Sequence, residues 1–265
     1  MGIKWLVMTI TLEYDVTTFS LPIEDGTIVG HAYKPKNNDI TNKTIIISHG
    51  FAETSAMFDH YARRFASTGY YTVTFDFRGG SLEGKSTGLK STEMSIFTEI
   101  ADLKTVINFV QKQESSSRSD LYLMGDSQGG LVSAIVGDNF TKQLGGLILL
   151  YPALVIPDDA RKRYHSLAEI PDTVDLGIPI GKVYYEKLLD YEVFDHVGHF
   201  GKSVLILHGD QDEVVPLSYS KRVAKVYSHA KLIVMKDAKH GFNEIESRIA
   251  GDYILEFLNK DEILN

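Results

Sequence analysis

The chain has 265 residues, of which 43% are hydrophobic and 23% are charged; this composition is that of a globular protein and excludes a disordered one. Its 27 Lys and Arg residues and 35 Asp and Glu residues give a net charge of −8, which argues against nucleic-acid binding as the main function. The absence of cysteine excludes disulfide scaffolds, cysteine-ligated zinc, iron–sulfur clusters and a thiol nucleophile.

The sequence predicts neither a membrane segment nor an export signal. No apolar run approaches the ~18 residues that are needed to cross a bilayer. The cluster at Ile3–Met8 is too short for the apolar part of a signal peptide and lacks a small-residue cleavage site. We therefore expect a cytoplasmic protein with no membrane or nucleic-acid partner, and a homodimer remains open.

Along the chain, short β-branched runs alternate with amphipathic segments of helical length. First, Phe19–Leu21 and Ile28–Tyr33 flank Asp25-Gly26 and predict an antiparallel hairpin. Near-continuous apolar runs then predict parallel strands covered by helices on both faces. These runs are Thr44–Ser48, Tyr71–Phe75, Leu121–Met124, Leu147–Tyr151, Val204–Leu207 and Leu232–Met235. The helical patterns lie near Phe58–Ala66, Met94–Gln111, Gly130–Gly137, Ser218–Tyr227 and Ile245–Leu258.

One stretch interrupts this alternation, from about Ala153 to Phe200. Structureless loops of such length are rare in compact domains, so we predict a small inserted subdomain. Ligands of open α/β sheets bind beyond the carboxyl ends of the strands, and the insertion follows a strand. We therefore predict that residues 153–200 form a cap over a site, whereas residues 1–152 and 201–265 form a mainly parallel α/β core.

The strongest chemical signal follows the predicted strand at Leu121–Met124. Residues 125–130 read GDSQGG and lead into a helical pattern, which is the G-x-S-x-G motif in its strand–turn–helix setting. A nucleophile on so tight a turn has strained backbone angles, and glycines two residues away on either side relieve the crowding. The helix start directs N–H groups toward an oxyanion that forms beside Ser127. We predict Ser127 as the catalytic nucleophile.

A serine nucleophile needs a base, and the base needs a carboxylate that fixes its tautomer. In this type of fold the chain order is serine, acid, histidine. His240 follows the last predicted strand and precedes the final helix, where the base is expected. Asp210, Asp212 and Glu213 are close together after the preceding strand, and spacing alone does not choose between them. We favour Asp212, because a Gly-x-x-Asp turn lets the loop curl over the sheet, and expect Asp210 to bond backbone N–H groups.

The first predicted parallel strand ends in the sequence HGFAE at residues 49–53. In such folds the loop after this strand supplies one N–H donor of the oxyanion hole, and the residue after the nucleophile supplies the other. We expect these two donors to be the backbone N–H groups of Phe51 and Gln128.

Taken together, these motifs make the chain similar to the α/β-hydrolase family over nearly its whole length. Within that family the chain most resembles the small bacterial cinnamoyl (feruloyl) esterases, which hydrolyse hydroxycinnamate esters and carry a short inserted cap. The resemblance implies an α/β-hydrolase fold. It also implies that the cap aspartate that holds the phenolic hydroxyl falls on Asp159, beside Asp158, and that the cap tyrosine falls on Tyr184 or Tyr185. One departure is Asp126, where many relatives have histidine; this change bears on the local pKa values or the pocket floor.

We therefore expect a serine esterase that acts on a small-molecule ester, most specifically a hydroxycinnamate ester, through an acyl-enzyme and without a metal or organic cofactor. His196 and His199 have the spacing of two metal ligands, but no matching third ligand is evident, so we expect them on the surface or in the cap. The fold and the three catalytic residues do not choose the acyl group. A short-chain ester, a monoacylglycerol, a thioester or a small amide, a perhydrolase activity, and a non-catalytic binding module remain as alternatives.

Overall fold

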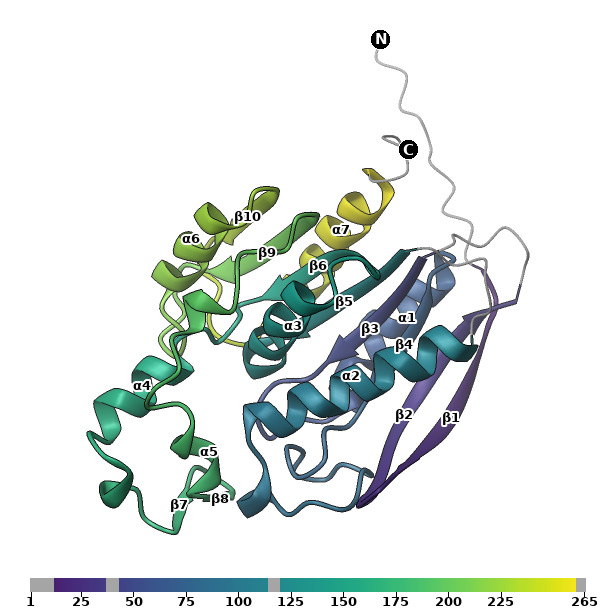
Figure 1. Cartoon of the computed structure of the whole chain (residues 1–265). Coiled ribbons are helices and arrows are strands. Elements are labelled where there is room, and N and C mark those ends of the chain that lie inside the picture. The colour runs from purple at the N-terminus through teal and green to yellow at the C-terminus, as the bar shows by residue number, and fades with distance from the viewer. Residues whose placement is uncertain (1–11, 37–42, 114–119, 261–265) are drawn as a thin grey trace.

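The computed structural model describes residues 12–36, 43–113 and 120–260, and the cluster at Ile3–Met8 lies outside the described residues. The long strands are β1 (Tyr14–Ile23), β2 (Gly26–Pro35), β3 (Lys43–Ser48), β4 (Tyr71–Phe75), β5 (Asp120–Asp126), β6 (Leu144–Leu150), β9 (Ser203–Gly209) and β10 (Ala230–Met235). They form one sheet in the order β1-β2-β4-β3-β5-β6-β9-β10 (Figure 1). Strand β2 runs antiparallel to both β1 and β4, and the other neighbours are parallel. The mainly parallel sheet with an antiparallel edge is confirmed.

The turn of the predicted hairpin lies one residue earlier than expected. Glu24 and Asp25 form the two-residue turn, while Gly26 already pairs with Ile23 as the first residue of β2. The reason is a close approach of another loop, since a Cβ atom on Gly26 would lie 2.1 Å from the carbonyl oxygen of Thr87. Glycine is therefore needed at this position both by the close approach of the Thr87 loop and by the positive backbone φ of 150°.

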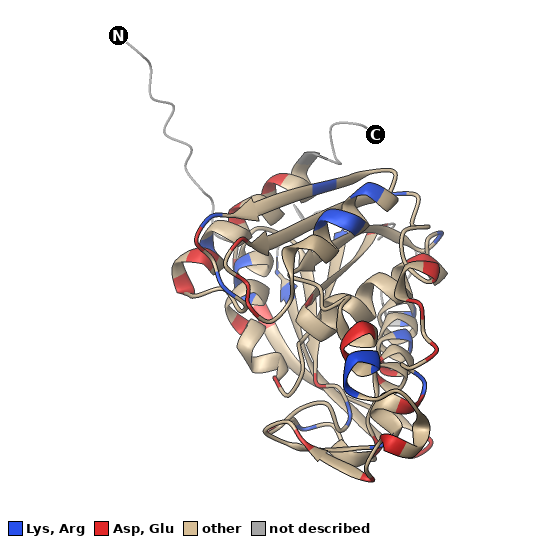
Figure 2. Ribbon diagram, turned by 90° about the vertical axis from the view of Figure 1, so that its left-hand side faces the viewer, with Lys and Arg blue, Asp and Glu red and all other residues tan. Residues whose placement is uncertain are grey.

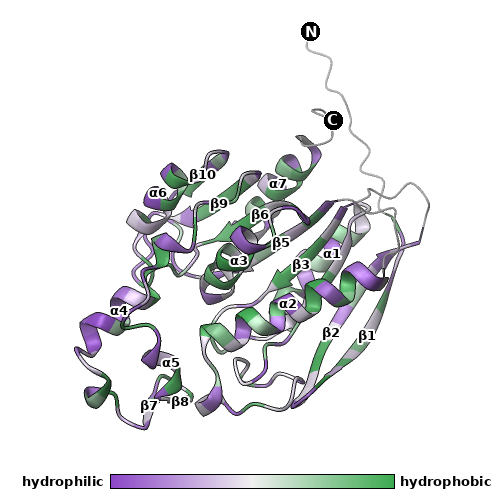
Figure 3. Cartoon of the chain, in the orientation of Figure 1, coloured by the Kyte–Doolittle hydropathy of each residue, from purple (hydrophilic) through white to green (hydrophobic). Residues whose placement is uncertain are grey.

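The main helices follow the strands with which they pack. They are α1 (Asp59–Ser67), α2 (Ile96–Gln113), α3 (Ser127–Asn139), α6 (Leu217–Val226) and α7 (Glu244–Lys260), with a short 3-10 helix η1 at Ser55–Phe58. Helices α2, α3 and α6 cover one face of the sheet, whereas α1 and α7 cover the other (Figure 1). In Figure 3 these helices carry stripes of hydrophobic and hydrophilic residues, as helices on the face of a buried sheet should.

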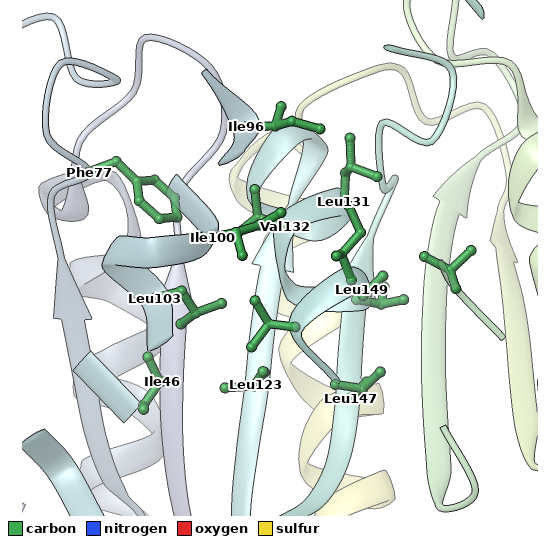
Figure 4. Packing of buried hydrophobic residues seen from close by; sticks show 14 of the residues in the cluster. Ile46, Phe77, Ile96, Ile100, Leu103, Leu123, Leu131, Val132, Leu147 and Leu149 are labelled. Carbon is green, nitrogen blue, oxygen red and sulfur yellow. The ribbon is translucent and has the colours of Figure 1, made fainter. Parts of the chain in front are cut away.

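The core divides into two layers because side chains alternate along each strand. In β5, Leu123 joins the cluster beneath α2 and α3, while Tyr122 and Met124 join the cluster beneath α1 and α7. Figure 4 shows the first cluster, in which side chains of β3, β5 and β6 pack against residues such as Leu103 of α2 and Val132 of α3. This two-sided burial accounts for the near-continuous apolar runs of the central strands.

Between β6 and β9 the chain leaves the sheet and forms short elements. They are α4 (Ile156–Arg163), η3 (Leu167–Glu169), β7 (Thr173–Asp175), β8 (Pro179–Gly181), α5 (Val183–Glu186) and η4 (Val193–Asp195), and they gather at the lower left of Figure 1. Ile180 and Tyr184 of this segment are buried in the same cluster as the helices α2 and α3. The segment therefore shares the core of the molecule instead of forming a second core.

The charged residues of both signs are interspersed along the ribbon, as Figure 2 shows. Among the helices in the described part of the chain, none is long and apolar enough to cross a membrane.

Candidate active site

Ser127 lies at the junction of β5 and α3, and its backbone φ of 45° is in the left-handed region. This conformation is strained for a residue with a side chain and persists only where the surroundings enforce it. Here the close packing of the surrounding backbone enforces this conformation. A Cβ atom on Gly129 would lie 2.4 Å from the carbonyl oxygens of Ser48 and His49, and one on Gly125 would lie 2.3 Å from the Gly129 carbonyl oxygen. The two glycines allow β3, β5 and α3 to approach closely enough to hold the turn.

His240 lies in the loop between β10 and α7 and reaches Ser127 across 3.0 Å, from its Nε2 atom to the serine Oγ atom. The other ring nitrogen, Nδ1, lies 2.8 Å from Oδ2 of Asp212. Since an ionised carboxylate only accepts hydrogen bonds, Nδ1 carries the proton and Nε2 is free to accept the serine proton. The ring of Tyr151 packs edge-on against that of His240, with centroids 4.9 Å apart, and helps to fix its plane.

Asp212 is held as a carboxylate by several donors, although burial alone would raise its pKa. Hydrogen bonds from His208 and His240 and from the Val215 amide outweigh that effect and hold the pKa of Asp212 far below its usual value. The amides of Val214 and Val215 donate to Oδ1 across 2.9 and 2.8 Å. This carboxylate therefore stays ionised beside His240.

His208 is a partner of the acid that the sequence analysis did not identify. Its ring is fully buried, and its Nε2 atom lies 3.2 Å from Oδ2 of Asp212 and 2.9 Å from the carbonyl oxygen of Val215. Both partners are acceptors, so Nε2 carries the proton, and Nδ1 accepts from the Ser220 hydroxyl at 2.7 Å. Asp210, by contrast, accepts a hydrogen bond from the amide of Asp237 at 2.7 Å.

The loop after β3 presents the Phe51 amide through a fixed peptide plane. The amide of Phe77 donates to Nε2 of His49 across 3.0 Å, so the His49 proton is on Nδ1, which donates to the Gly50 carbonyl oxygen at 2.7 Å. This carbonyl and the Phe51 N–H belong to one peptide unit and point in opposite directions. The neighbouring amide of Ala52 is used within the structure, because it donates to the Gly80 carbonyl oxygen at 3.0 Å.

The side chain of Gln128, whose backbone N–H is the other expected donor, joins α3 to two other elements. Its Nε2 atom lies 2.9 Å from both carboxylate oxygens of Glu99 on α2, and its Oε1 atom accepts from the Tyr184 hydroxyl at 2.5 Å. Burial raises the pKa of Glu99 to about 8. This link could not be predicted from the sequence, because a glutamate on an amphipathic helix usually faces solvent.

The structure separates the residues that the resemblance placed in the substrate site. The Tyr184 ring lies near Phe51, with centroids 6.2 Å apart, and the Tyr185 ring lies 5.1 Å from that of Tyr184. Asp159 is exposed and forms an ion pair with Lys162 at 3.0 Å. The adjacent Asp158 accepts hydrogen bonds from Arg161 and from the Tyr219 hydroxyl. Tyr184 thus lies next to the loop after β3, Tyr185 lies next to Tyr184, and both aspartates have partners of their own.

The two histidines with metal-ligand spacing lie apart from this site. The His196 ring stacks on Tyr191 with centroids 4.3 Å apart, and Nδ1 of His199 lies 3.1 Å from Asp138. Within residues 12–36, 43–113 and 120–260, no three His, Asp or Glu side chains form a group that could hold a metal ion.

A protein family and several known proteins are similar to this chain. Residues 39–180 match the family described as serine aminopeptidase, S33. The structure of Est1E from Butyrivibrio proteoclasticus with bound ferulic acid is 26% identical, with a TM-score of 0.79, and covers 92% of this chain and 99% of its own. A monoacylglycerol lipase from Mycolicibacterium smegmatis is 24% identical in an alignment of 251 residues, which covers 81% of this chain and 87% of the lipase. An α/β-hydrolase domain-containing protein from mouse is 17% identical with a TM-score of 0.70, covers 92% of this chain and 99% of its own, and shares the fold.

These findings confirm the α/β-hydrolase fold, which the sheet order and the flanking helices already display. The family match includes β3, β5 and the turn that carries Ser127, and it covers more than half of the chain. The chain therefore belongs to the serine aminopeptidase S33 family of α/β-hydrolase-fold serine hydrolases.

Proposed function

We propose that this chain is a carboxylic-ester hydrolase in which Ser127, His240 and Asp212 form the catalytic triad, and that it acts on hydroxycinnamate esters. The observation that carries this proposal is the row of hydrogen bonds from Ser127 Oγ through His240 to Asp212, at 3.0 and 2.8 Å. The three side chains come from distant parts of the sequence and meet at one edge of the sheet, as nucleophilic catalysis requires.

The geometry supports a two-step acyl transfer. Ser127 Oγ attacks the ester carbonyl carbon while Nε2 of His240 takes the serine proton, and Asp212 stabilises the resulting imidazolium. The carbonyl oxygen becomes an oxyanion, which the backbone N–H groups of Phe51 and Gln128 stabilise. Collapse of this intermediate breaks the bond to the alcohol, and the alcohol leaves with the proton from His240.

Water then repeats the sequence on the acyl-enzyme. His240 takes a proton from the water as its oxygen attacks the acyl carbon, and the second oxyanion occupies the same two donors. Collapse of this intermediate releases the carboxylic acid and returns the proton to Ser127. No step of this reaction uses a metal or an organic cofactor.

The aromatic residues beside the oxyanion loop support an aromatic acyl group. Phe51, Tyr184, Tyr185 and Tyr164 form a continuous row, with successive ring centroids 6.2, 5.1 and 5.1 Å apart. Planar rings pack favourably against such a row. The similar Est1E structure was solved with ferulic acid bound, which points to the same substrate class. In this proposal residues 153–200 are the cap that carries the three tyrosines.

A monoacylglycerol is the second candidate substrate, because the Mycolicibacterium relative is a monoacylglycerol lipase. The two candidates differ in shape, since one acyl group is planar and the other is a flexible chain. We expect kcat/KM for methyl ferulate to exceed that for a monoacylglycerol by about tenfold or more, the usual size of such discrimination. A higher kcat/KM for the monoacylglycerol would assign the lipid ester as the substrate. If the protein hydrolysed neither ester, the proposal of ester hydrolysis would be rejected.

The role proposed for Asp159 needs its own experiment, because its carboxylate is paired with Lys162. If Asp159 binds the phenolic hydroxyl, Asp159→Asn raises KM for methyl ferulate. KM for methyl cinnamate, which lacks that hydroxyl, stays unchanged. Equal effects on the two esters would remove Asp159 from the site while leaving the esterase proposal intact.

A further inference from the structure

The side chain of Asp126 has an unusual orientation for its place in the chain. Asp126 is the N-cap residue of α3, with φ −111° and ψ 153°, yet its side chain makes no hydrogen bond to the helix amides. Aspartate is among the preferred N-cap residues because its carboxylate accepts from those amides. Instead, the group is buried to 1% exposure directly before Ser127, and Oδ1 finds no hydrogen-bond partner among the described residues.

The carboxyl group of Asp126 faces a second carboxyl group, that of Glu53 in the loop after β3, whose charge raises the pKa of Asp126. A Cβ atom on Gly50 would lie 3.2 Å from Oδ2 of Asp126 and 3.0 Å from Oε2 of Glu53, so both oxygens border the same small space. Two carboxylates this close repel one another, and a proton held between them removes that repulsion and provides a hydrogen bond.

Among the described residues, no cation faces the two carboxyl groups to allow both to ionise. The other titratable side chains that face Asp126 are the hydroxyls of Tyr61 on α1 and Tyr151 after β6. His49, on the Glu53 side, is neutral in the tautomer described above, and burial lowers its pKa. Burial, which is the largest effect, and the charge of Glu53 raise the pKa of Asp126, and they outweigh a hydrogen bond from Tyr151 that lowers it. The unpartnered Oδ1 atom fits the carbonyl oxygen of a neutral carboxylic acid.

Glu53 connects this pair to the oxyanion loop. Its Oε2 atom accepts a hydrogen bond from the Gly50 amide at 2.9 Å, while the Gly50 carbonyl is held by His49. Gly50 is therefore fixed on both sides, and the peptide that it shares with Phe51 carries the proposed oxyanion donor. A change in the position of Glu53 therefore acts on the Phe51 N–H group through Gly50.

We propose that Asp126 and Glu53 share one proton and that this acid pair positions the oxyanion loop against the nucleophile. The inference rests on the proposed function, and it makes Asp126 and Glu53 positioning residues rather than catalytic ones. When the shared proton is lost at high pH, two adjacent anions repel one another, Glu53 moves away, and the Gly50–Phe51 peptide loses its fixed orientation. Acyl transfer then slows on the alkaline side.

The test measures the pH dependence of Ser127 acylation from about pH 6 to pH 10, with p-nitrophenyl butyrate and with a fluorophosphonate as probes. Asp126→Asn supplies a donor that does not titrate, so we expect this variant to retain most of the activity and to lose the alkaline decline. Asp126→Leu fills a similar space without a donor. We expect its kcat to fall by up to about 10²–10³-fold, because loss of one oxyanion donor costs about that much.

Two further variants separate this pair from other late-titrating groups. Glu53→Gln also removes the second charge and should abolish the alkaline decline. Glu99→Gln changes a buried carboxyl group outside the pair, and we expect it to keep the wild-type decline. Thermal unfolding of each variant shows whether it is folded.

The outcomes are distinct. If Asp126→Asn shows the wild-type alkaline decline, or if Asp126→Leu is as active as Asp126→Asn, the shared proton has no positioning role. If the fluorophosphonate fails to label Ser127 in the wild-type protein, the proposed function itself fails.

Discussion

The ionisation state and the orientation of the Asp212 carboxylate are set by the groups that surround it. Two histidines and two backbone amides donate to its carboxylate, and one of these donors, His240, is the proposed base. The remaining donors fix the carboxylate in the orientation that His240 needs. A neutral amide at this position would keep the shape but would favour the other tautomer of His240.

We therefore predict that Asp212→Asn lowers kcat by about 10⁴-fold with a small change in KM. The matched control is Asp210→Asn in the same loop, because Asp210 bonds only backbone and side-chain groups away from His240. Steady-state kinetics with p-nitrophenyl butyrate measure both variants. A loss in Asp210→Asn equal to that in Asp212→Asn would show that the loop, and not the carboxylate, carries the effect.

At the scale of elements, a buried polar chain connects α2, α3 and α5. Glu99 on α2 accepts from Gln128 on α3, which accepts from Tyr184 on α5. Asp102, one turn along α2 from Glu99, is bound by the side chain of Arg78 at 2.8 Å. Such networks fix the relative position of elements, because a half-satisfied buried group costs more than a fully bonded one gains.

The raised pKa of Glu99 makes a prediction about stability. In the unfolded chain Glu99 loses its proton near its usual pKa of 4.5, whereas the folded protein retains the proton to about pH 8. The unfolded state thus binds fewer protons between these values, so this group lowers the free energy of unfolding as pH rises through that window. Glu99→Gln cannot titrate, and we expect it to gain stability relative to wild type between pH 5 and pH 8.

Urea denaturation at the two pH values measures this difference. The matched control is Glu186→Gln, which changes an exposed glutamate on α5 and should follow the wild-type pH dependence. Parallel pH curves for Glu99→Gln and wild type would show that Glu99 is ionised in the folded protein.

The sequence predicted the elements well because the strands are apolar on both faces. Each of the six predicted parallel strands corresponds to a strand of the structure, and β4 has the predicted bounds. Helix α3 begins at Ser127 and not at Gly130, because three glycines in the turn hide the helical start. Glycine has the lowest helix propensity apart from proline, so its packing role within a tight turn is invisible to a periodicity argument.

The candidate site was predictable only in part. Ser127, Asp212 and His240 follow the ends of strands, and parallel strands bring such residues to one edge, where the structure places them within hydrogen-bonding distance. Their catalytic roles stay predictions. The pair of Glu53 and Asp126 could not be foreseen, because a charged residue in a loop gives no sign that it is buried against another.

At the scale of the whole molecule, two apolar layers hold the sheet between its helices. Leu123 in the central strand β5 is fully buried in the layer beneath α2 and α3. Leu82 lies in a loop and is 57% exposed. The same substitution at these two positions therefore separates the contribution of the core from that of the surface.

We predict that Leu123→Ala lowers the free energy of unfolding by about 2–5 kcal/mol, through lost burial and the cavity left behind. Leu82→Ala should change it by about 0.5 kcal/mol or less, as is usual for surface substitutions. Denaturant unfolding at neutral pH measures both values. Similar losses at the two positions would contradict the packing described here.

The most direct test of the account is covalent labelling with a fluorophosphonate, followed by peptide mapping of the labelled residue. The proposed mechanism predicts that the label is found on Ser127 alone. It also predicts that Ser127→Ala abolishes labelling and that His240→Gln slows it while the protein stays folded. Labelling of another residue, or undiminished labelling of Ser127→Ala, would contradict the claim that Ser127 is a nucleophile activated by His240.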